Sequence, residues 1–111
     1  MDEKTILKNF RQEIKKGALV MVILHVLKEK HYGYALVRTL EDMDFTVDRN
    51  TLYPLLRRLE DQGLLQANWD TSKTRPRKYY TTSPEGLSLL PKMDAVYTSY
   101  KQAIEKIMGG Y

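Results

Sequence analysis

Residues 48–65 read Asp48-Arg49-Asn50-Thr51-Leu52-Tyr53-Pro54-Leu55-Leu56-Arg57-Arg58-Leu59-Glu60-Asp61-Gln62-Gly63-Leu64-Leu65, and this stretch decides the fold. Its leucines recur at the spacing of a helix with one buried face: Leu52, Leu55, Leu56 and Leu59. Three polar residues near the start can cap such a helix: Asp48, Asn50 and Thr51. Pro54 is tolerated only near a helix start, and Gly63 supplies the positive φ of a helix end. The stretch therefore predicts a helix that begins within residues 48–51 and ends before Gly63.

The face of this helix opposite the leucines carries polar groups in its first half. At 100° per residue it holds Asn50, Pro54, Arg57 and Asp61, flanked by Thr51, Tyr53 and Arg58. Hydrogen-bonding side chains in that position are typical of a helix that enters the DNA major groove. The stretch alone is equally compatible with an amphipathic helix whose charged face is merely solvated.

Two helical segments are predicted before a connection at residues 31–34. Residues 2–16 form an extra amphipathic helix with a basic cast and a bend at Gly17; its apolar edge holds Ile6, Leu7, Phe10 and Ile14. Residues 18–30 are apolar almost all round, which indicates a helix buried on several sides. A second subunit would cover part of it, through residues such as Leu19 and Ile23, or it is the central helix of a monomeric core.

A short helix and a turn precede the opening stretch. Residues 34–43 have Leu36, Val37, Leu40 and Met43 on the inward side, and residues 44–47 form a turn. The order of helix, short turn and helix is that of a helix-turn-helix.

After Gly63 the hydrophobic period changes to that of strands. Residues 64–69 and 78–82 alternate and are rich in aromatic and β-branched side chains, so they predict two antiparallel strands. The intervening polar loop is basic and holds Lys73, Arg75 and Arg77, followed by Lys78. A basic hairpin directly after a helix-turn-helix indicates the wing of a winged helix, which places cations beside sugar-phosphate. The alternative is a loop that serves only solubility.

Ser83-Pro84-Glu85 predicts the start of a last helix, with serine as the N-cap and proline at N1. An apolar seam with heptad spacing follows: Leu90, Met93, Tyr97, Tyr100, Ile104 and Ile107. The preceding core cannot cover so long a seam, so we expect it to pair with the same helix of a second copy. Pro91 predicts a kink or break between residues 87 and 91, and residues 109–111 should fray.

Composition excludes several classes of protein. The chain has 111 residues, a formal net charge of +4 and no cysteine, which excludes a disulfide framework and fits one soluble domain in a reducing compartment. The apolar run at residues 18–24 is much shorter than the roughly 20 residues of a membrane span, so a cytoplasmic protein is expected. His25 and His31 lack metal-ligand spacing, and no phosphate loop or nucleophile motif is present. The sequence predicts no metal, no cofactor and no enzyme.

Three motifs in order resemble those of the PadR family of bacterial transcriptional regulators. They are Tyr32-Gly33-Tyr34-Ala35-Leu36, residues 51–64, and Arg75-Pro76-Arg77-Lys78-Tyr79-Tyr80 with Thr82 and Gly86. The resemblance covers about residues 17–108, in the small form of the family with one C-terminal helix. It implies a winged-helix homodimer that represses genes and responds to small molecules, often phenolic acids or hydrophobic drugs. It also implies that Tyr32, Tyr53 and Lys78 touch operator phosphates and that Thr51 begins the recognition helix.

The chain departs from the family at two points. Asn50 replaces the small residue common there, which would alter base contacts, and the C-terminal helix lacks the tryptophan on which one branch stacks drugs. Tyr97 and Tyr100 offer an aromatic surface instead.

The sequence thus predicts a mainly α fold with a small β-hairpin, a winged helix-turn-helix that forms a homodimer through its N-terminal and C-terminal helices. Residues 1–82 are expected to bind a double-stranded DNA operator (wing at residues 64–82), and residues 83–111 to dimerise. The expected DNA-binding residues are Tyr32, Arg49, Asn50, Thr51, Tyr53, Arg57, Arg75, Arg77 and Lys78. The expected dimer contacts are Leu19, Ile23, Leu90, Met93, Tyr97, Tyr100, Ile104 and Ile107, and an aromatic or hydrophobic effector would lie near Met93, Tyr97 and Tyr100. The alternative is a winged-helix module that binds protein without specific DNA binding.

Overall fold

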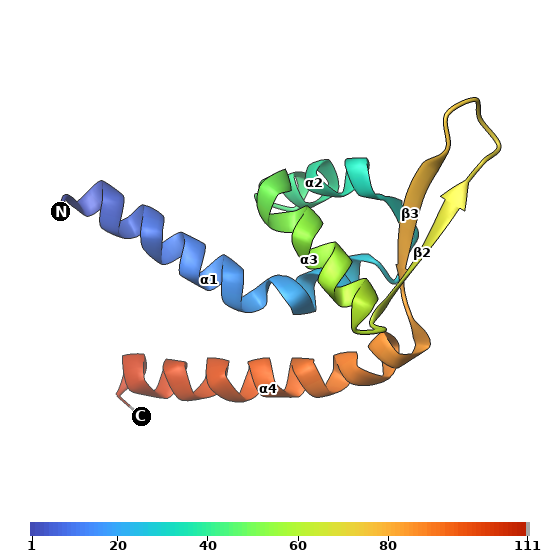
Figure 1. Cartoon of the computed structure of the whole chain (residues 1–111). Helices are drawn as coiled ribbons and strands as arrows, with labels where there is room; N and C mark the ends of the chain where they lie inside the picture. The colour runs from blue at the N-terminus through green and yellow to red at the C-terminus, as the bar shows by residue number, and fades with distance from the viewer. Residues whose placement is uncertain (111) are drawn as a thin grey trace.

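The computed structural model of the chain describes residues 1–110 and is mainly helical, with a small antiparallel sheet (Figure 1). Its elements, in chain order, are α1 (Glu3–Val26), β1 (His31–Tyr32), α2 (Gly33–Asp42), α3 (Arg49–Asp61), β2 (Leu65–Asp70), β3 (Arg77–Thr82) and α4 (Pro84–Gly109). Helices α2 and α3 form the helix-turn-helix, and β2 and β3 form the wing. The predicted mainly α fold with a winged helix-turn-helix is therefore confirmed. The sequence predicts fraying at residues 109–111. Tyr111, the last of these residues, lies outside the part of the chain that the structure describes.

Helix α3 has the ends that its sequence predicts. The Asp48 carboxylate accepts a hydrogen bond from the Thr51 N–H (2.7 Å), so Asp48 is the N-cap. At the other end Gly63 has φ +78°, and the Leu64 N–H donates to the Leu59 carbonyl (2.9 Å), as in a Schellman motif. These local contacts fix both ends of the helix without help from the rest of the chain.

The sheet has three strands in the order β1-β3-β2, one more than the sequence predicts. The strand β1 pairs His31 with Tyr80 and Tyr32 with Tyr79. Residues 31–34 were predicted as a tight connection, but they form this two-residue strand and the first turn of α2. A strand so short carries no periodicity of its own, because its pairing depends on β3, about fifty residues later.

Helix α1 is continuous through Gly17, so the predicted bend there is wrong. Glycine in an exposed helix costs only about 0.5–1 kcal/mol relative to alanine, which is too little to end a helix of this length. The helix stops at Val26, before the predicted limit of residue 30. Helix α4 is likewise unbroken at Pro91, where the sequence predicts a kink or break.

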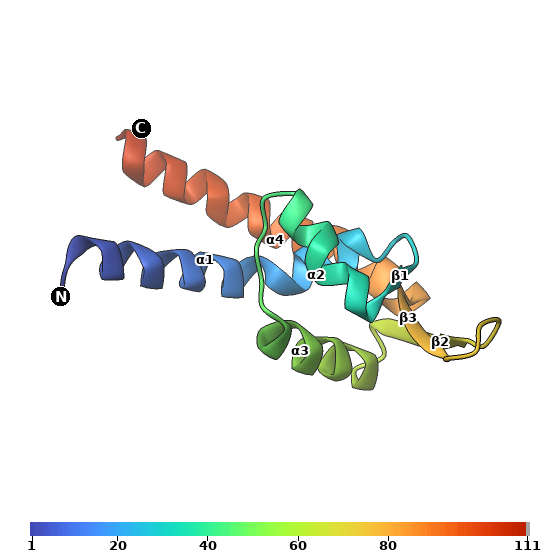
Figure 2. The ribbon, with the colours of Figure 1, turned by 90° about the horizontal axis from the view of Figure 1, so that it is seen from above.

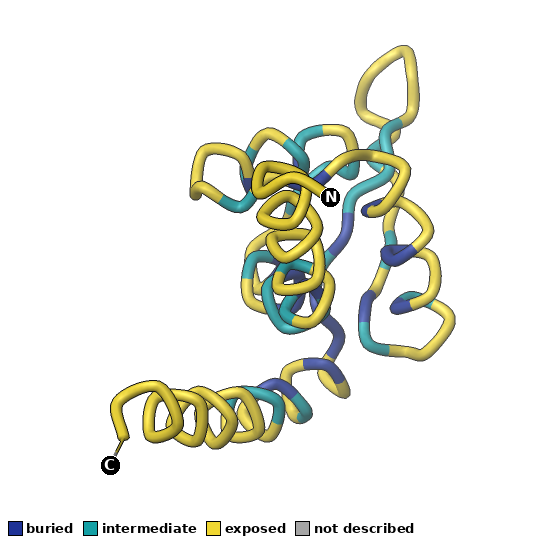
Figure 3. Tube along the Cα trace, turned by 90° about the vertical axis from the view of Figure 1, so that its left-hand side faces the viewer, coloured by how far each residue is buried: buried dark blue, intermediate teal, exposed yellow. Residues whose placement is uncertain are grey.

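The N-terminal half of α1 and the C-terminal half of α4 extend from the same side of the core (Figures 1 and 2). The molecule is consequently elongated, with principal extents of 57 × 35 × 23 Å. Both projecting segments are exposed along their length (Figure 3). The hairpin extends from the opposite end (Figures 1 and 2).

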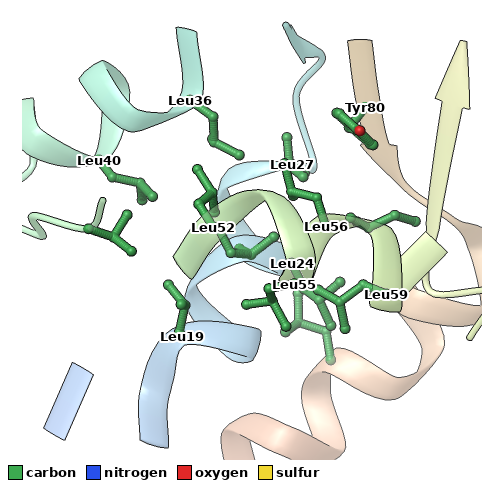
Figure 4. Packing of buried hydrophobic residues seen from close by; sticks show 14 residues of the cluster. Leu19, Leu24, Leu27, Leu36, Leu40, Leu52, Leu55, Leu56, Leu59 and Tyr80 are labelled. Carbon is green, nitrogen blue, oxygen red and sulfur yellow. The ribbon is translucent and has the colours of Figure 1, made fainter. Parts of the chain in front are cut away.

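The core lies where α1, α2 and α3 meet the sheet and the start of α4 (Figure 4). It is built mostly from leucines that are almost fully buried: Leu24, Leu27, Leu36, Leu40, Leu52, Leu56, Leu59 and Leu90. Met43 was predicted to face this core, but its side chain is 62% exposed because α2 ends at Asp42 and Met43 caps it.

The junction between β3 and α4 is held by buried polar groups. The Thr82 hydroxyl donates to the Leu24 carbonyl (2.8 Å), and the Ser83 hydroxyl donates to the Gly63 carbonyl (2.6 Å). Ser83 also caps α4 by accepting from the Gly86 N–H (3.0 Å). These bonds fix the direction in which α4 leaves the sheet.

Candidate nucleic-acid interface

A groove of about 560 Å³ lies between α3 and the wing. Tyr53 and Arg57 line it from α3, and Gly33 and Tyr34 line it from the start of α2. The wing contributes the remaining lining, namely Arg75, Pro76, Arg77, Lys78 and Tyr80. Five of the nine predicted DNA-binding residues thus line one groove that combines cationic and phenolic groups. This is a chemistry suited to phosphate oxygens.

Lys78 is held at the side of this groove by the acidic end of α3. Its ammonium lies 3.2 Å from a Glu60 carboxylate oxygen and 5.2 Å from the centre of the Tyr80 ring. Partial burial disfavours the charged ammonium, but the hydrogen bonds and charge of Glu60 and Tyr80 outweigh it and raise the pKa of Lys78. Lys78 therefore stays cationic, and Glu60 sets its direction and competes with any phosphate for it.

Tyr32 does not line this groove. Its hydroxyl donates to an Asp70 carboxylate oxygen at 2.6 Å, and Asp70 also accepts from the Ser72 hydroxyl (2.6 Å) and N–H (3.0 Å). The hydrogen bonds from Ser72 and Tyr32 hold the pKa of Asp70 well below its usual range, and the Asp70 carboxylate raises the pKa of Tyr32. The phenolic proton is thus committed to Asp70, which leaves the Tyr32 oxygen only as an acceptor.

A ladder of tyrosines and cations connects this pair to the groove. The Tyr32 ring stacks on Tyr34 (centroids 5.6 Å apart) and meets Tyr79 edge to face (6.2 Å). Arg77 lies 4.9 Å above the Tyr34 ring, which orients its guanidinium toward the groove. Tyr34 and Tyr79 are not among the predicted site residues, although both belong to the motifs that resemble those of the family.

Replacing Asp70 with asparagine tests this arrangement through its pH dependence. Because the pKa of Asp70 is lowered in the folded state, its charge stabilises the fold above the unfolded carboxyl pKa, about 3.9. We expect Asp70→Asn to lower the melting temperature at pH 7, and the difference from the wild type to shrink as the pH falls below about 4. Thermal unfolding between pH 3 and pH 7 measures this. An equal difference at every pH would contradict the assignment of the charge.

The three remaining predicted DNA-binding residues, Arg49, Asn50 and Thr51, are exposed in the first turn of α3. They lie at the opposite end of the helix from Glu60. Thr51 lines a second groove, of about 460 Å³, that includes Lys15 and Lys16 of α1. Sequence reasoning did not bring these two lysines to the start of α3, since the contact joins segments about thirty residues apart.

Comparison with known proteins identifies the family of this fold. A sequence profile described as the transcriptional regulator PadR-like family matches residues 23–92, which is more than half of the chain. The chain belongs to the PadR family of transcriptional regulators.

Individual relatives agree with this assignment. The crystal structure of a PadR-family transcriptional regulator from Eggerthella lenta superposes with a TM-score of 0.89 at 43% identity, covering 95% of this chain and 94% of that one. A PadR-like regulator from Bacillus cereus gives a TM-score of 0.78 at 27% identity, over 89% and 99% of the two chains. Transcriptional regulator Rv3488 of Mycobacterium tuberculosis is 30% identical over 97 residues, 86% of this chain and 84% of its own length.

The PadR-family chain has a third groove, mainly apolar and of about 530 Å³, between α1 and α4. The three residues predicted to lie near an effector, Met93, Tyr97 and Tyr100, all line it. From α1 it receives Ile14, Gly17, Ala18, Val20 and Met21, and from α4 also Leu89, Lys92 and Val96. The structure therefore brings together two apolar segments that are distant in the sequence.

Three of the predicted dimer contacts are already buried within one chain. Leu19, Ile23 and Leu90 are exposed by 4%, 0% and 2%, so they have almost no surface left for a second copy to cover. Their prediction as interface residues is wrong, because the sequence does not tell which apolar positions of α1 and α4 the core of the same chain buries. Four other predicted dimer contacts have side chains that are 50–81% exposed and so available to a second copy: Tyr97, Tyr100, Ile104 and Ile107.

His25 ties the two helices together at the inner end of this groove. Its Nε2 lies 2.7 Å from an Asp94 carboxylate oxygen, and both side chains are about 40% exposed. This contact joins α1 to a residue of α4 that lies about seventy positions later in the chain. Among residues 1–110, no helix is both long and apolar enough to cross a membrane.

Proposed function

We propose that this PadR-family regulator is a sequence-specific DNA-binding protein that acts as a dimeric repressor. The observation that carries the proposal is the groove between α3 and the wing, where Arg57 faces three cations of residues 75–78. A recognition helix in the major groove brings the adjacent backbone against such a wing. Arg57 and the first-turn residues Asn50 and Thr51 would read base edges, and Arg49 and Tyr53 would lie beside them.

The other contacts would position the protein on the duplex. Arg75, Arg77 and Lys78 would bind phosphates, Lys78 by exchanging Glu60 for a phosphate oxygen. Tyr32 would reach a phosphate only by exchanging its hydrogen bond to Asp70. We thus assign DNA contact to residues 1–82 and dimerisation to residues 83–111.

Arg57→Ala tests the reading role. Loss of a base contact costs about 1–3 kcal/mol, so we expect the preference for a footprinted promoter fragment over random duplex to fall about 10-fold or more. Arg58→Ala is the matched control, since Arg58 is one residue along α3 and does not line the groove. Mobility shifts on both duplexes measure the ratio. Weak binding with no preference even in the wild type would instead fit the protein-interaction module.

We propose further that the chain dimerises through the exposed apolar surfaces of α1 and α4. The large side chains concerned are Ile6, Leu7, Phe10, Ile14, Val96, Tyr97, Tyr100, Ile104, Ile107 and Met108, each at least 45% exposed. A single chain rarely leaves so many large apolar side chains exposed on two helices. Pairing along α4 would set the two copies of α3 to half-sites about one helical turn apart, roughly 34 Å.

The double variant Tyr100→Asp/Ile104→Asp is expected to be a monomer, because it places two charges in the apolar seam. Sedimentation equilibrium should give the wild type twice the 13.0 kDa of one chain and the variant a single chain. Ser99→Asp, on another side of α4, should remain dimeric. A wild type that sediments as one chain at micromolar concentration would contradict the dimer.

An aromatic or hydrophobic effector would occupy the groove beside Met93, Tyr97 and Tyr100. It would alter DNA binding only if it bound more tightly to one arrangement of the two subunits than to another, because only then does it shift the equilibrium between them. Thermal shifts with phenolic and cationic aromatic compounds test this, and stabilisation by none of them would oppose it.

A further inference from the structure

The N-terminal half of α1 has two chemically different edges. At 100° per residue, four cations fall within about 60° of one another around the helix: Lys4, Lys8, Arg11 and Lys15. The apolar residues Ile6, Leu7, Phe10 and Ile14 fall on a separate arc, whose centre lies about 120° around the helix from that of the cations. None of the three acidic residues of this half, Asp2, Glu3 and Glu13, lies among the cations. We call the four cations and the adjacent Lys16 the basic edge.

The basic edge turns toward α3. The Lys15 ammonium donates to the Thr46 carbonyl (3.0 Å), in the turn that leads into α3. Lys15 and Lys16 line the groove that also contains Asp48 and Thr51. Ile14 and Gly17, by contrast, line the apolar groove beside α4. The packing of α1 thus sorts its edges, with the apolar edge toward α4 and the basic edge toward the recognition helix.

The N-terminal half of α1 extends from α3 on the side away from the hairpin (Figures 1 and 2). Helix α3 is therefore bordered by basic groups at both ends, the wing at one end and the basic edge at the other. Within residues 1–110, none of the cations of the basic edge has a salt-bridge partner. Lys4, Lys8 and Arg11 lie in the half of α1 that projects past the core.

We propose that the basic edge of α1 is a second DNA-backbone contact, which holds phosphates beyond the end of α3 remote from the wing. The inference rests on the proposed function and extends the binding surface to a part of the chain outside the winged helix-turn-helix. Cations at spacings of three or four residues present one charged row, which suits the regular negative charge of a duplex. Because phosphates carry no base identity, this contact adds affinity without changing sequence preference.

The double variant Lys8→Gln/Arg11→Gln tests the proposal in the full chain. Glutamine keeps the helix propensity of α1 while it removes two charges. Its matched control is Lys101→Gln/Lys106→Gln, which removes the same two charges from exposed positions of α4. Binding is measured by fluorescence anisotropy on a random duplex of about 40 base pairs, four helical turns, and on a footprinted promoter fragment, across a series of KCl concentrations.

We expect the Lys8→Gln/Arg11→Gln variant to bind both duplexes about 10-fold or more weakly at about 0.1 M KCl. The slope of log K against log [KCl] should be shallower by about 2 per chain, because about 0.9 is lost with each phosphate contact. The ratio of the two affinities should not change. Hydroxyl-radical footprints should lose backbone protection on one side of each half-site and keep it beneath the wing.

Equal affinities and slopes for this variant and its α4 control would overturn the proposal. If Arg75→Glu in the wing still weakens binding in that experiment, only the contact by α1 fails and the proposed function stands. If the wild type binds neither duplex, the proposed function fails together with it. Circular dichroism of both variants establishes that α1 remains helical.

Discussion

Gly86→Ala is expected to lower the free energy of unfolding by about 2–3 kcal/mol, and the melting temperature by roughly 10–20 °C. An added Cβ at this position would lie 2.4 Å from the Leu64 carbonyl oxygen and 2.7 Å from the Thr82 methyl carbon. The first neighbour is backbone and cannot rotate away. It also accepts the Ser83 N–H (3.0 Å), so relief of the clash would disturb the junction on which α4 depends.

Ser88→Ala is the control for this prediction, since Ser88 is exposed two residues further along α4. It removes a hydroxyl from a helix surface and should change stability by less than about 0.5 kcal/mol. Thermal and urea unfolding at one protein concentration compare the two variants. A Gly86→Ala protein as stable as the wild type would mean that α4 does not leave the sheet as closely as the structure shows.

Arg75→Glu is expected to weaken binding to duplex DNA by about 10- to 100-fold at about 0.1 M KCl. The side chain lines the groove between α3 and the wing from an exposed loop, so its reversal removes one phosphate contact and adds one repulsion. The loss should be similar for all sequences, because in the proposed function the wing binds phosphates and does not read bases. The salt dependence should become shallower in parallel.

Lys106→Glu makes the same change of charge on α4, away from the groove. It separates a local contact from the general effect of lowering a formal net charge of +4. Anisotropy titrations on random duplex give both affinities. Equal affinities of the Arg75→Glu and Lys106→Glu variants for the duplex would show that the groove makes no specific contribution to DNA binding.

The elements predicted correctly from sequence are those fixed by local signals. Asp48 and Gly63 mark the ends of α3 through hydrogen bonds between residues three to five positions apart. Both ends can therefore be predicted from the local sequence. Ser83 and Pro84 mark the start of α4 in the same way. The alternation of the two wing strands is likewise a property of the segment itself.

Most of the predictions that failed concern contacts between distant segments. The pairing of β1 with β3 cannot be predicted from the two residues of β1 alone. Nothing in the sequence around Leu19 and Ile23 shows that the core of the same chain buries them. Gly17 failed for a different reason, since its small local preference is outweighed by the residues on either side. The candidate site follows the same division, because its cations were found from motifs but the partners Glu60 and Asp70 were not.

Selection of binding sites from a pool of random duplexes tests the central claim most directly. A dimer that places two copies of α3 in successive major grooves should enrich an inverted repeat whose half-site centres are about 10 base pairs, or a multiple of one helical turn, apart. The Arg57→Ala protein should enrich it less strongly. Recovery of sequences with no motif beyond that of the starting pool would contradict the account.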